Sequence, residues 1–361
     1  MPNKSQQQKK QKFSVSPDFT LNEEFEPFNE HYNVFGRIMW DKEYMNYHKF
    51  MYDKVPLIIS DGIPGYREID HALAIASWTV HDYFRSAFSW EKLNKPANVM
   101  KIPEPKQYPI DESNIQEVTQ YVKAIAKLFG ASLVGITAFD PRWVYTEDRV
   151  GTPIELPEGL TNIIAIAIEM DADAISTSPS MTQGFANGLG YSNMAALVAS
   201  LAEFIRKLGY QAIPSGNDTA LSIPIAIQAG LGQLGRNGLL VTRQFGSRVR
   251  LCKVFTDMPL LHDEPVDFGL TDYCRRCKRC AEACEVDAIS FDEEPSFKSY
   301  PPSQNKGILR WTIKADLCYQ FWVDNGGECS TCITSCPFNM RTAQRYLEPE
   351  KFWEKKLEDK E

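Results

Sequence analysis

The sequence predicts a layered α/β (α+β) core followed by a cysteine-rich module, and two observations carry this prediction. Between residues 111 and 263, amphipathic helical patterns are interleaved with apolar runs, which is typical of helices packed on a buried sheet. Between Cys274 and Cys336, eight of the nine cysteines fall into two runs. The chain has 361 residues, of which 43% are hydrophobic and 24% charged, so it can bury a large core without covalent crosslinks.

The elements of the predicted core follow from hydrophobic periodicity. A helix begins at Ser113, where apolar residues recur every three or four positions until Gly130. A second helix is expected to take Ser192 or Asn193 as its N-cap and to end at Gly209. Five β-rich runs are expected as strands: residues 132–137, 162–170, 210–214, 238–242 and 250–256.

The regions outside the core differ from it in composition. We expect a disordered basic tail over 1–18, an aromatic-rich segment wrapping the core over 19–110, and a C-terminal helix or tail over 341–361. No apolar run reaches the ~18 residues that a membrane helix requires. The net charge of -8 argues against broad electrostatic capture of nucleic acid.

The cysteine spacing is that of bacterial ferredoxins. The first run reads C-x2-C-x2-C-x3-C, and the second reads C-x10-C-x2-C-x3-C-P with its first gap stretched. In such runs three thiolates wrap one cubane and the fourth cysteine ligates the other cluster. The prediction is therefore one 4Fe–4S cluster on Cys274, Cys277, Cys280 and Cys336, and a second on Cys318, Cys329, Cys332 and Cys284.

Three details qualify this interpretation. Structural zinc is the alternative, because zinc sites also use C-x2-C pairs. Glu285 stands where a proline usually follows the first run, but that proline is not a ligand. Cys252, the ninth cysteine, is expected to be a buried strand residue without a ligand role.

A glycine-rich segment at 230–235 matches G-x-G-x-x-G, yet its context argues against a dinucleotide site. Such a fingerprint follows a strand and opens a helix. Here residues 224–229 are predicted as a short helix entering the motif, and a strand leaves it. The glycines still indicate tight turns or close approach to a large flat group.

The segments GYSNMAALVASLAEF, SGNDTALSIP, GLGQLGRNGLL and SRVRLCKVF, together with NVFGRIMWD and the two cysteine runs, resemble the corrinoid- and iron–sulfur-dependent reductive dehalogenases. The resemblance covers about residues 22–339, and the family is related to epoxyqueuosine reductase. It implies a nitroreductase-like corrinoid-binding core over 111–263 and a ferredoxin-like module over 264–340. It also implies cobalamin or a related corrinoid bound base-off, and no histidine here lies in an Asp-x-His-x-x-Gly setting.

The resemblance assigns roles to individual residues. Tyr191 matches the proton-donating tyrosine, with Asn217 and Arg250 as its polar partners. A position just before a helix start at Ser192 would favour the phenolate form of Tyr191 through the helix dipole. Trp322 and Tyr319 are expected to line an apolar substrate pocket. The expected corrinoid contacts are Gly232, Leu234, Gly235 and Asn237.

The function implied by the resemblance is replacement of halogen by hydrogen in an organohalide, with electrons delivered through the two clusters. An epoxyqueuosine-reductase-like tRNA-modification enzyme and a non-catalytic electron-transfer or corrinoid protein are the alternatives. The expected partners are a small organohalide, a low-potential electron donor and a small membrane-anchor subunit, with a homodimer as one assembly and no nucleic acid. With no signal peptide in the sequence as given, we expect a cytoplasmic location, or a membrane-associated periplasmic or exterior one if a twin-arginine signal was removed.

Overall fold

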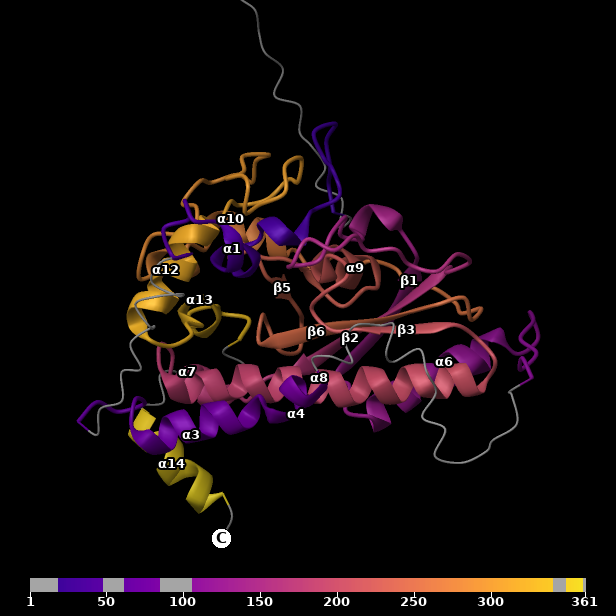
Figure 1. Cartoon of the computed structure of the whole chain (residues 1–361), viewed down its shortest axis with the longest axis horizontal. Coiled ribbons are helices and arrows are strands. Elements are labelled where there is room, and N and C mark those ends of the chain that lie inside the picture. The colour runs from indigo at the N-terminus through magenta and orange to yellow at the C-terminus, as the bar shows by residue number, and fades with distance from the viewer. Residues whose placement is uncertain (1–18, 48–61, 85–105, 340–348, 360–361) are drawn as a thin grey trace, which may run out of the picture.

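The computed structural model describes residues 19–47, 62–84, 106–339 and 349–359. Its centre is a four-stranded antiparallel sheet in the order β1-β2-β6-β3, so the core is of mixed α and β type with no parallel pair among these strands. The strands are β1 (Leu133–Ala138), β2 (Asn162–Glu169), β3 (Ala212–Ser215) and β6 (Val249–Thr256). Figure 1 shows α8 running along one face of this sheet and α9 lying on the other.

Both faces of the sheet are buried because strands β2 and β6 carry apolar side chains in both directions. Ile164 and Ile166 pack with helices α6 (Ile115–Leu128) and α8 (Met181–Lys207), whereas Ile163 and Phe255 pack with α9 (Ser222–Gln228). Ile163 pairs with Phe255 across the β2–β6 ladder. The helix predicted from Ser113 to Gly130 is confirmed as α6, and the strands predicted at β1, β2, β3 and β6 are confirmed as well. The strand expected over 238–242 is only two residues long.

Helix α8 begins far earlier than the sequence pattern predicted. Ser180 is its N-cap, accepting a hydrogen bond from the Gln183 N–H, so the prediction of a cap at Ser192 or Asn193 was wrong. Three glycines in the first half of the helix obscured it, because glycine is a poor helix former. One of them has a packing reason: a Cβ at Gly190 would lie 2.8 Å from Arg250 Cγ.

The glycine-rich segment forms a hairpin rather than a nucleotide-binding turn. It follows helix α9, as predicted, and its strands are β4 (Gln233–Leu234) and β5 (Leu240–Val241). Gly230 has a φ of 74°, which glycine adopts readily after a helix end. The G-x-G-x-x-G match is therefore not a dinucleotide fingerprint.

The cysteine-rich segment consists of short helices joined by loops. They are α10 (Leu270–Arg276), α11 (Arg279–Glu282), α12 (Ala315–Asn325) and α13 (Thr331–Thr334). Figure 1 shows α10, α12 and α13 together on the side of the sheet where β5 lies. Arg236, which is buried, joins the two parts: its guanidinium donates to the carbonyl oxygens of Cys274, Ser290 and Asp292.

The N-terminal segment contributes small elements that pack on both parts. The elements are η1 (Glu30–Tyr32), α1 (Val34–Trp40), α3 (Glu68–Ser77) and α4 (Thr79–Phe84); η2 (Pro141–Trp143), α7 (Ala172–Ser176) and the C-terminal α14 (Pro349–Glu358) complete the described fold. Phe19 and Phe25 pack edge-on against Trp143. The predicted tail over 1–18 lies outside the described residues.

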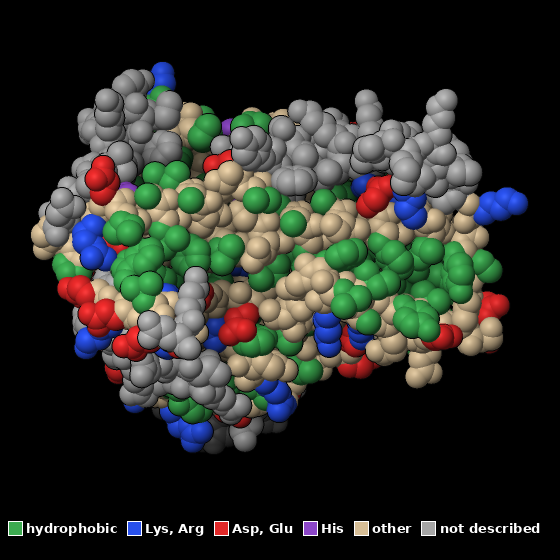
Figure 2. Space-filling view, turned by 90° about the horizontal axis from the view of Figure 1, so that it is seen from below, with side chains coloured by type: hydrophobic (Ala, Val, Ile, Leu, Met, Phe, Trp, Pro, Cys, Tyr) green, Lys and Arg blue, Asp and Glu red, His purple; other side chains and the backbone are tan. Residues whose placement is uncertain are grey.

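The lower face of the molecule presents apolar side chains to solvent. Figure 2 views the molecule from below and shows hydrophobic side chains across this face. Exposed large hydrophobics of the helices beneath the sheet include Ile75, Leu128 and Leu189. Within the described part of the chain, no helix combines the length and the hydropathy needed to cross a membrane.

Candidate active site

A cavity of about 510 Å³ lies between the core and the cysteine-rich segment. The core side of its wall includes Asn217, Leu234 and Arg250, and the opposite side includes Trp322 and Cys332. This size is usual for sites that hold small molecules and cofactors. The cavity is therefore the place where groups from both parts can act on one ligand.

The structure brings together the three residues predicted to be catalytic. Asn217 Nδ2 lies 3.3 Å from the Tyr191 hydroxyl oxygen, and the Arg250 guanidinium carbon lies 5.0 Å from the centre of the Tyr191 ring. Trp78 stacks on this ring with centroids 4.9 Å apart. Asn217 and Arg250 line the cavity directly; Tyr191 is not among the lining residues, and its hydroxyl approaches the cavity beside Asn217.

The expected helix-dipole effect on Tyr191 does not apply. Tyr191 lies in the middle of α8, where the backbone N–H groups are used within the helix, and not at a helix start. Two other features of its position matter instead. The residue faces Arg250 on β6, and it lies one helical turn after Asn187.

Asn187 and Glu328 surround Arg250 and were missed by the sequence analysis. The Asn187 side chain accepts a hydrogen bond from Arg250 Nη2 and donates one to Glu328. Burial raises the pKa of Glu328, whereas the Arg250 charge and the Asn187 hydrogen bond lower it. Helical spacing from Tyr191 would have identified Asn187 if the start of α8 had been predicted correctly.

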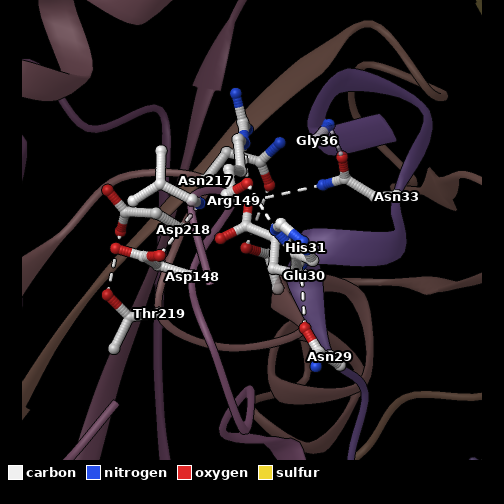
Figure 3. A network of polar contacts seen from close by, with 12 residues as sticks. Asn29, Glu30, His31, Asn33, Gly36, Asp148, Arg149, Asn217, Asp218 and Thr219 are labelled. Carbon is white, nitrogen blue, oxygen red and sulfur yellow. Dashed lines mark hydrogen bonds and ion pairs between the residues drawn. The ribbon is translucent and has the colours of Figure 1, made fainter. Parts of the chain in front are cut away.

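A network of polar contacts lies behind the loop that carries Asn217 (Figure 3). Arg149 Nε donates to the buried Glu30 carboxylate at 2.7 Å, which ties the N-terminal segment to the 145–153 loop. Burial raises the pKa of Glu30, and the Arg149 charge opposes that rise. The loop continues into the site, because Tyr145 N–H donates to the carbonyl oxygen of Thr219 and the Tyr145 side chain lines the cavity.

Cysteines of both predicted sets lie close enough to affect one another's pKa. Burial raises the pKa of Cys274 to about 11 and that of Cys280 to about 12, and nearby Cys336 adds to both shifts. Burial likewise raises the pKa of Cys318 to about 12, with Cys329 and Cys284 adding to it. Thiols clustered in this way are costly to ionise unless iron compensates their charge, so the donor set fits two clusters.

The two cysteine sets differ in their relation to the cavity. Its lining residues include all four cysteines of the second set, namely Cys284, Cys318, Cys329 and Cys332, and none of the first. The N–H of Ala288 donates to Cys284 Sγ at 3.3 Å, a type of contact that helps to set cluster potentials. Within the described residues, no three His, Cys, Asp or Glu side chains converge on a single ion-sized position.

Two of the four expected corrinoid contacts line the cavity. Leu234 and Asn237 do so, from the hairpin and its turn. Gly232 and Gly235 instead allow the hairpin strands to pack closely: a Cβ at Gly235 would lie 2.7 Å from both Asn237 Oδ1 and Val241 Cγ2. Close packing inside the hairpin therefore explains why these two positions are glycine.

Of the two expected pocket aromatics, Trp322 lines the cavity and Tyr319 packs in a core cluster with Ile38 and Tyr44. Tyr319 contacts Phe35 edge-on, with centroids 5.1 Å apart. Trp322 Nε1 is buried and has no hydrogen-bond partner among the described residues, and the same is true of Arg250 Nε. Two unpartnered donors in the wall of one cavity fit a site built for a bound polar group.

The cysteine-rich segment matches a known protein family. Residues 273–340 match the family model of a 4Fe-4S dicluster domain. This range contains both cysteine runs. The prediction of two 4Fe–4S clusters is confirmed over the alternative of structural zinc.

Curated proteins are similar in sequence to a larger part of the chain. A tetrachloroethene reductive dehalogenase of Desulfitobacterium hafniense is 37% identical over 266 residues, which cover 62% of this chain and 48% of that protein. The enzyme of the same name from Sulfurospirillum multivorans is 36% identical over 261 residues, covering 64% of this chain and 52% of that protein. The chain thus spans about half the length of the curated relatives it matches.

A solved structure and a more distant relative complete the comparison. The structure, described as a reductive dehalogenase that suggests a mechanism for B12-dependent dehalogenation, matches with a TM-score of 0.58 and 26% identity over 70% of this chain and 35% of that chain. An epoxyqueuosine reductase of Cyclobacterium marinum is 34% identical over 129 residues, covering 35% of this chain and 37% of that protein.

Proposed function

We propose that this chain, a homologue of the reductive dehalogenases, is itself a reductive dehalogenase that replaces halogen by hydrogen in a small organohalide. The observation that carries the proposal is the cavity, whose wall combines Asn217 and Arg250 with the four cysteines of the second set. Reduction of a carbon–halogen bond consumes two electrons and one proton and releases a halide ion. The wall that carries the cysteines can deliver the electrons. The wall that carries Asn217 and Arg250 lies beside the proposed proton donor.

We infer that the cavity holds a base-off corrinoid in a core of nitroreductase-like type. When bound, a corrinoid supplies a redox-active cobalt that can cleave a carbon–halogen bond. Leu234 and Asn237 would lie against it from the hairpin, and the unpartnered donors of Trp322 and Arg250 would face the cavity's contents. No histidine occurs among the described residues that line the cavity.

In this proposal Tyr191 donates the proton that replaces the halide. Asn217 Nδ2 points at the tyrosine oxygen, and Arg250 lies over the ring, where a cation stabilises negative charge on the phenol. Arg250 is in turn oriented by Asn187. A tyrosine held in this way can give up a proton and be reprotonated from solvent.

The position of the cysteines suggests the order of electron transfer. The second set lines the cavity, whereas no cysteine of the first set is part of its wall. Electrons would therefore enter at the cluster on Cys274, Cys277, Cys280 and Cys336 and leave through the cluster on Cys284, Cys318, Cys329 and Cys332. A low-potential donor, a membrane-anchor subunit and a homodimeric assembly belong to the same proposal.

The experiment that tests the function is anaerobic reconstitution with iron, sulfide and cobalamin, followed by assays on two substrate classes. We expect halide release from members of an organohalide panel and no reduction of epoxyqueuosine in a tRNA stem loop. The opposite pattern would support the epoxyqueuosine-reductase alternative. Loss of both activities in fully loaded protein would favour a non-catalytic electron carrier.

The Tyr191→Phe variant tests the proposed proton donor. We expect kcat for halide release to fall by about 100-fold or more, because positioned acids contribute at least that much to proton-transfer steps. Iron and cobalamin content should stay at the parent level. Full activity in this variant would remove Tyr191 from the mechanism.

A further inference from the structure

Lys253 is a buried cation directly behind the proposed site. It lies on β6 with its side chain on the opposite face of the sheet from Arg250, because side chains alternate along a strand. Its side chain is fully buried, and its Nζ has three neutral oxygen partners. They are the carbonyl oxygens of Gly216 at 3.0 Å and Asp218 at 2.8 Å, and Ser222 Oγ at 3.1 Å.

These contacts hold the turn that carries Asn217. The carbonyl oxygens on both sides of Asn217 bind the same ammonium group, so the backbone is clamped around this residue. Thr219, next along the turn, has a φ of 64°, a conformation that a β-branched residue adopts only when its surroundings impose it. Ser215 adds a hydrogen bond to the Asp218 carbonyl oxygen.

A chain of hydrogen bonds leads from Lys253 to Tyr191. Lys253 Nζ contacts Ser222 Oγ, Ser222 Oγ lies 3.3 Å from Asn217 Oδ1, and Asn217 Nδ2 lies 3.3 Å from the Tyr191 hydroxyl oxygen. An ammonium group can only donate, and its three hydrogens match its three partners. Ser222 therefore accepts from Lys253, and its own hydrogen is directed to Asn217 Oδ1.

The donor-to-acceptor direction of the hydrogen bonds, which Lys253 sets at Ser222, also determines the hydrogen bond between Asn217 and Tyr191. With Oδ1 of Asn217 engaged by Ser222, the amide group of Asn217 can turn only its Nδ2 hydrogens toward Tyr191. The tyrosine oxygen then accepts a hydrogen bond, and its own O–H remains available to another acceptor. This is the arrangement that a proton donor needs.

We propose that Lys253 is a positioning residue that, through Ser222, fixes the orientation of the Asn217 amide and thereby directs the Tyr191 hydroxyl hydrogen toward the reacting ligand. The inference rests on the proposed function, because it assigns Tyr191 as the proton donor. Two separable effects follow from it. Lys253 clamps the turn, whereas Ser222 transmits only the direction of the hydrogen bonds.

The Ser222→Ala variant separates direction from clamping. It removes the relay but leaves both carbonyl contacts of Lys253, so we expect kcat for halide release to fall about 10-fold with KM within about 2-fold of the parent. Ser222→Thr keeps a hydroxyl and should recover kcat to within about 3-fold of the parent. Ser200→Ala, which removes an exposed hydroxyl that bonds to Ala196 on α8, is the matched control and should change neither constant.

The Lys253→Met variant tests the clamp without any activity measurement. Hydrogen–deuterium exchange of the peptide covering 215–222 in the loaded protein should be about 10-fold faster than in the parent, and unchanged in Ser222→Ala. If Lys253→Met does not fold, Lys253→Arg serves, since its fork cannot place three hydrogens on the same oxygens.

The outcomes distinguish this inference from the proposed function. Parent-level kcat in Ser222→Ala, equal losses in the Ala and Thr variants, or unchanged exchange on replacing Lys253 would each overturn the role of Lys253. A parent protein that releases no halide from any organohalide would instead overturn the proposed function. In that case faster exchange in the Lys253 variant would still support the clamp.

Discussion

The two walls of the cavity are built in different ways. The core wall rests on long regular elements: Arg250 lies on the eight-residue strand β6, and Asn187 lies on the 27-residue helix α8. The opposite wall rests on helices of four to eleven residues whose cysteines approach one another in buried surroundings. Backbone hydrogen bonds and apolar packing therefore define the first wall, whereas the second depends on what binds its thiolates.

The largest expected effect is on the cysteine wall. Cys332→Ser should remove the cavity-side cluster, because it deletes one of the four predicted thiolate ligands. Burial and the neighbouring cysteines raise the pKa of the Cys332 thiol well above its usual value, so this thiolate needs a bound metal to compensate its charge. We expect the anaerobically purified protein to lose about half of its iron and all dehalogenation activity.

Cys252→Ala is the matched control for that variant. Cys252 is buried in β6, and burial raises its pKa to about 12, so it is an inert core residue. Its replacement should leave the iron content at the parent level and reduce stability by about 1 kcal/mol through the small cavity left behind. Iron loss in Cys252→Ala equal to that in Cys332→Ser would mean that the two walls do not differ as described.

The junction between the walls should give the next largest effect. Arg236→Met removes the buried guanidinium from the carbonyl oxygens of Cys274, Ser290 and Asp292, of which, among the described residues, only Asp292 keeps a second donor, Trp311 Nε1. We expect the free energy of unfolding to fall by about 3 kcal/mol, since charge-assisted hydrogen bonds are lost and acceptors remain unsatisfied. The measurement is the thermal midpoint of the iron-loaded protein.

Arg142→Met provides the exposed counterpart for the junction. Arg142 pairs with Asp140 at the surface, where such a pair contributes at most about 1 kcal/mol. Its thermal midpoint should stay close to the parent. A midpoint for Arg236→Met as high as that of Arg142→Met would show that the guanidinium does not hold the cysteine-rich segment to the core.

The difference between the walls also explains what could be predicted from sequence. Helix α6 and strands β1, β2 and β6 were predictable because their apolar periodicity reports burial directly. The two cysteine sets were predictable because ligand spacing is a local property of the chain. Both signals lie within short segments and need no knowledge of tertiary contacts.

Features that depend on tertiary contacts could not be predicted. The first half of α8 contains Gly184, Gly188 and Gly190, which suggest a loop until one sees that Gly188 packs against Trp78 and Gly190 against Arg250. For the same reason Asn187 was missed, and the helix-dipole argument for Tyr191 failed. Lys253 carried no signal at all, since a lysine in an apolar strand pattern is usually read as the exposed edge of a sheet.

A smaller effect, dependent on pH, belongs to the core wall. Burial lowers the pKa of Lys253 from 10.5 to about 8, although the negative charges of Asp218 and Glu30 act in the opposite direction. Between pH 8 and 10.5 the unfolded chain then binds more protons at this residue than the folded chain does. The stability of the parent should therefore rise with pH in this range relative to Lys253→Met, as the cost of a buried charge disappears.

The check on that prediction is the difference in thermal midpoint between parent and Lys253→Met, measured from pH 7 to 10. We expect the thermal midpoint of the parent to rise relative to that of the variant above pH 8. The turnover of the parent should fall over the same range, because the ammonium group that directs Ser222 loses a proton. A difference that is flat over this range would mean that Lys253 has the same pKa in the folded and unfolded chain.

The smallest effect is expected at Trp322. Phenylalanine at this position keeps most of the apolar surface of the cavity wall but removes the buried Nε1–H, which has no partner among the described residues. A carbon–halogen substrate offers few acceptors for that hydrogen, so we expect KM to change by less than about 3-fold, with kcat and iron content at the parent level. Trp322→Ala, which leaves a cavity, should raise KM by about 10-fold or more. A larger loss in the Phe variant than in the Ala variant would show that Nε1–H, and not the apolar surface, is what this wall presents to its ligand.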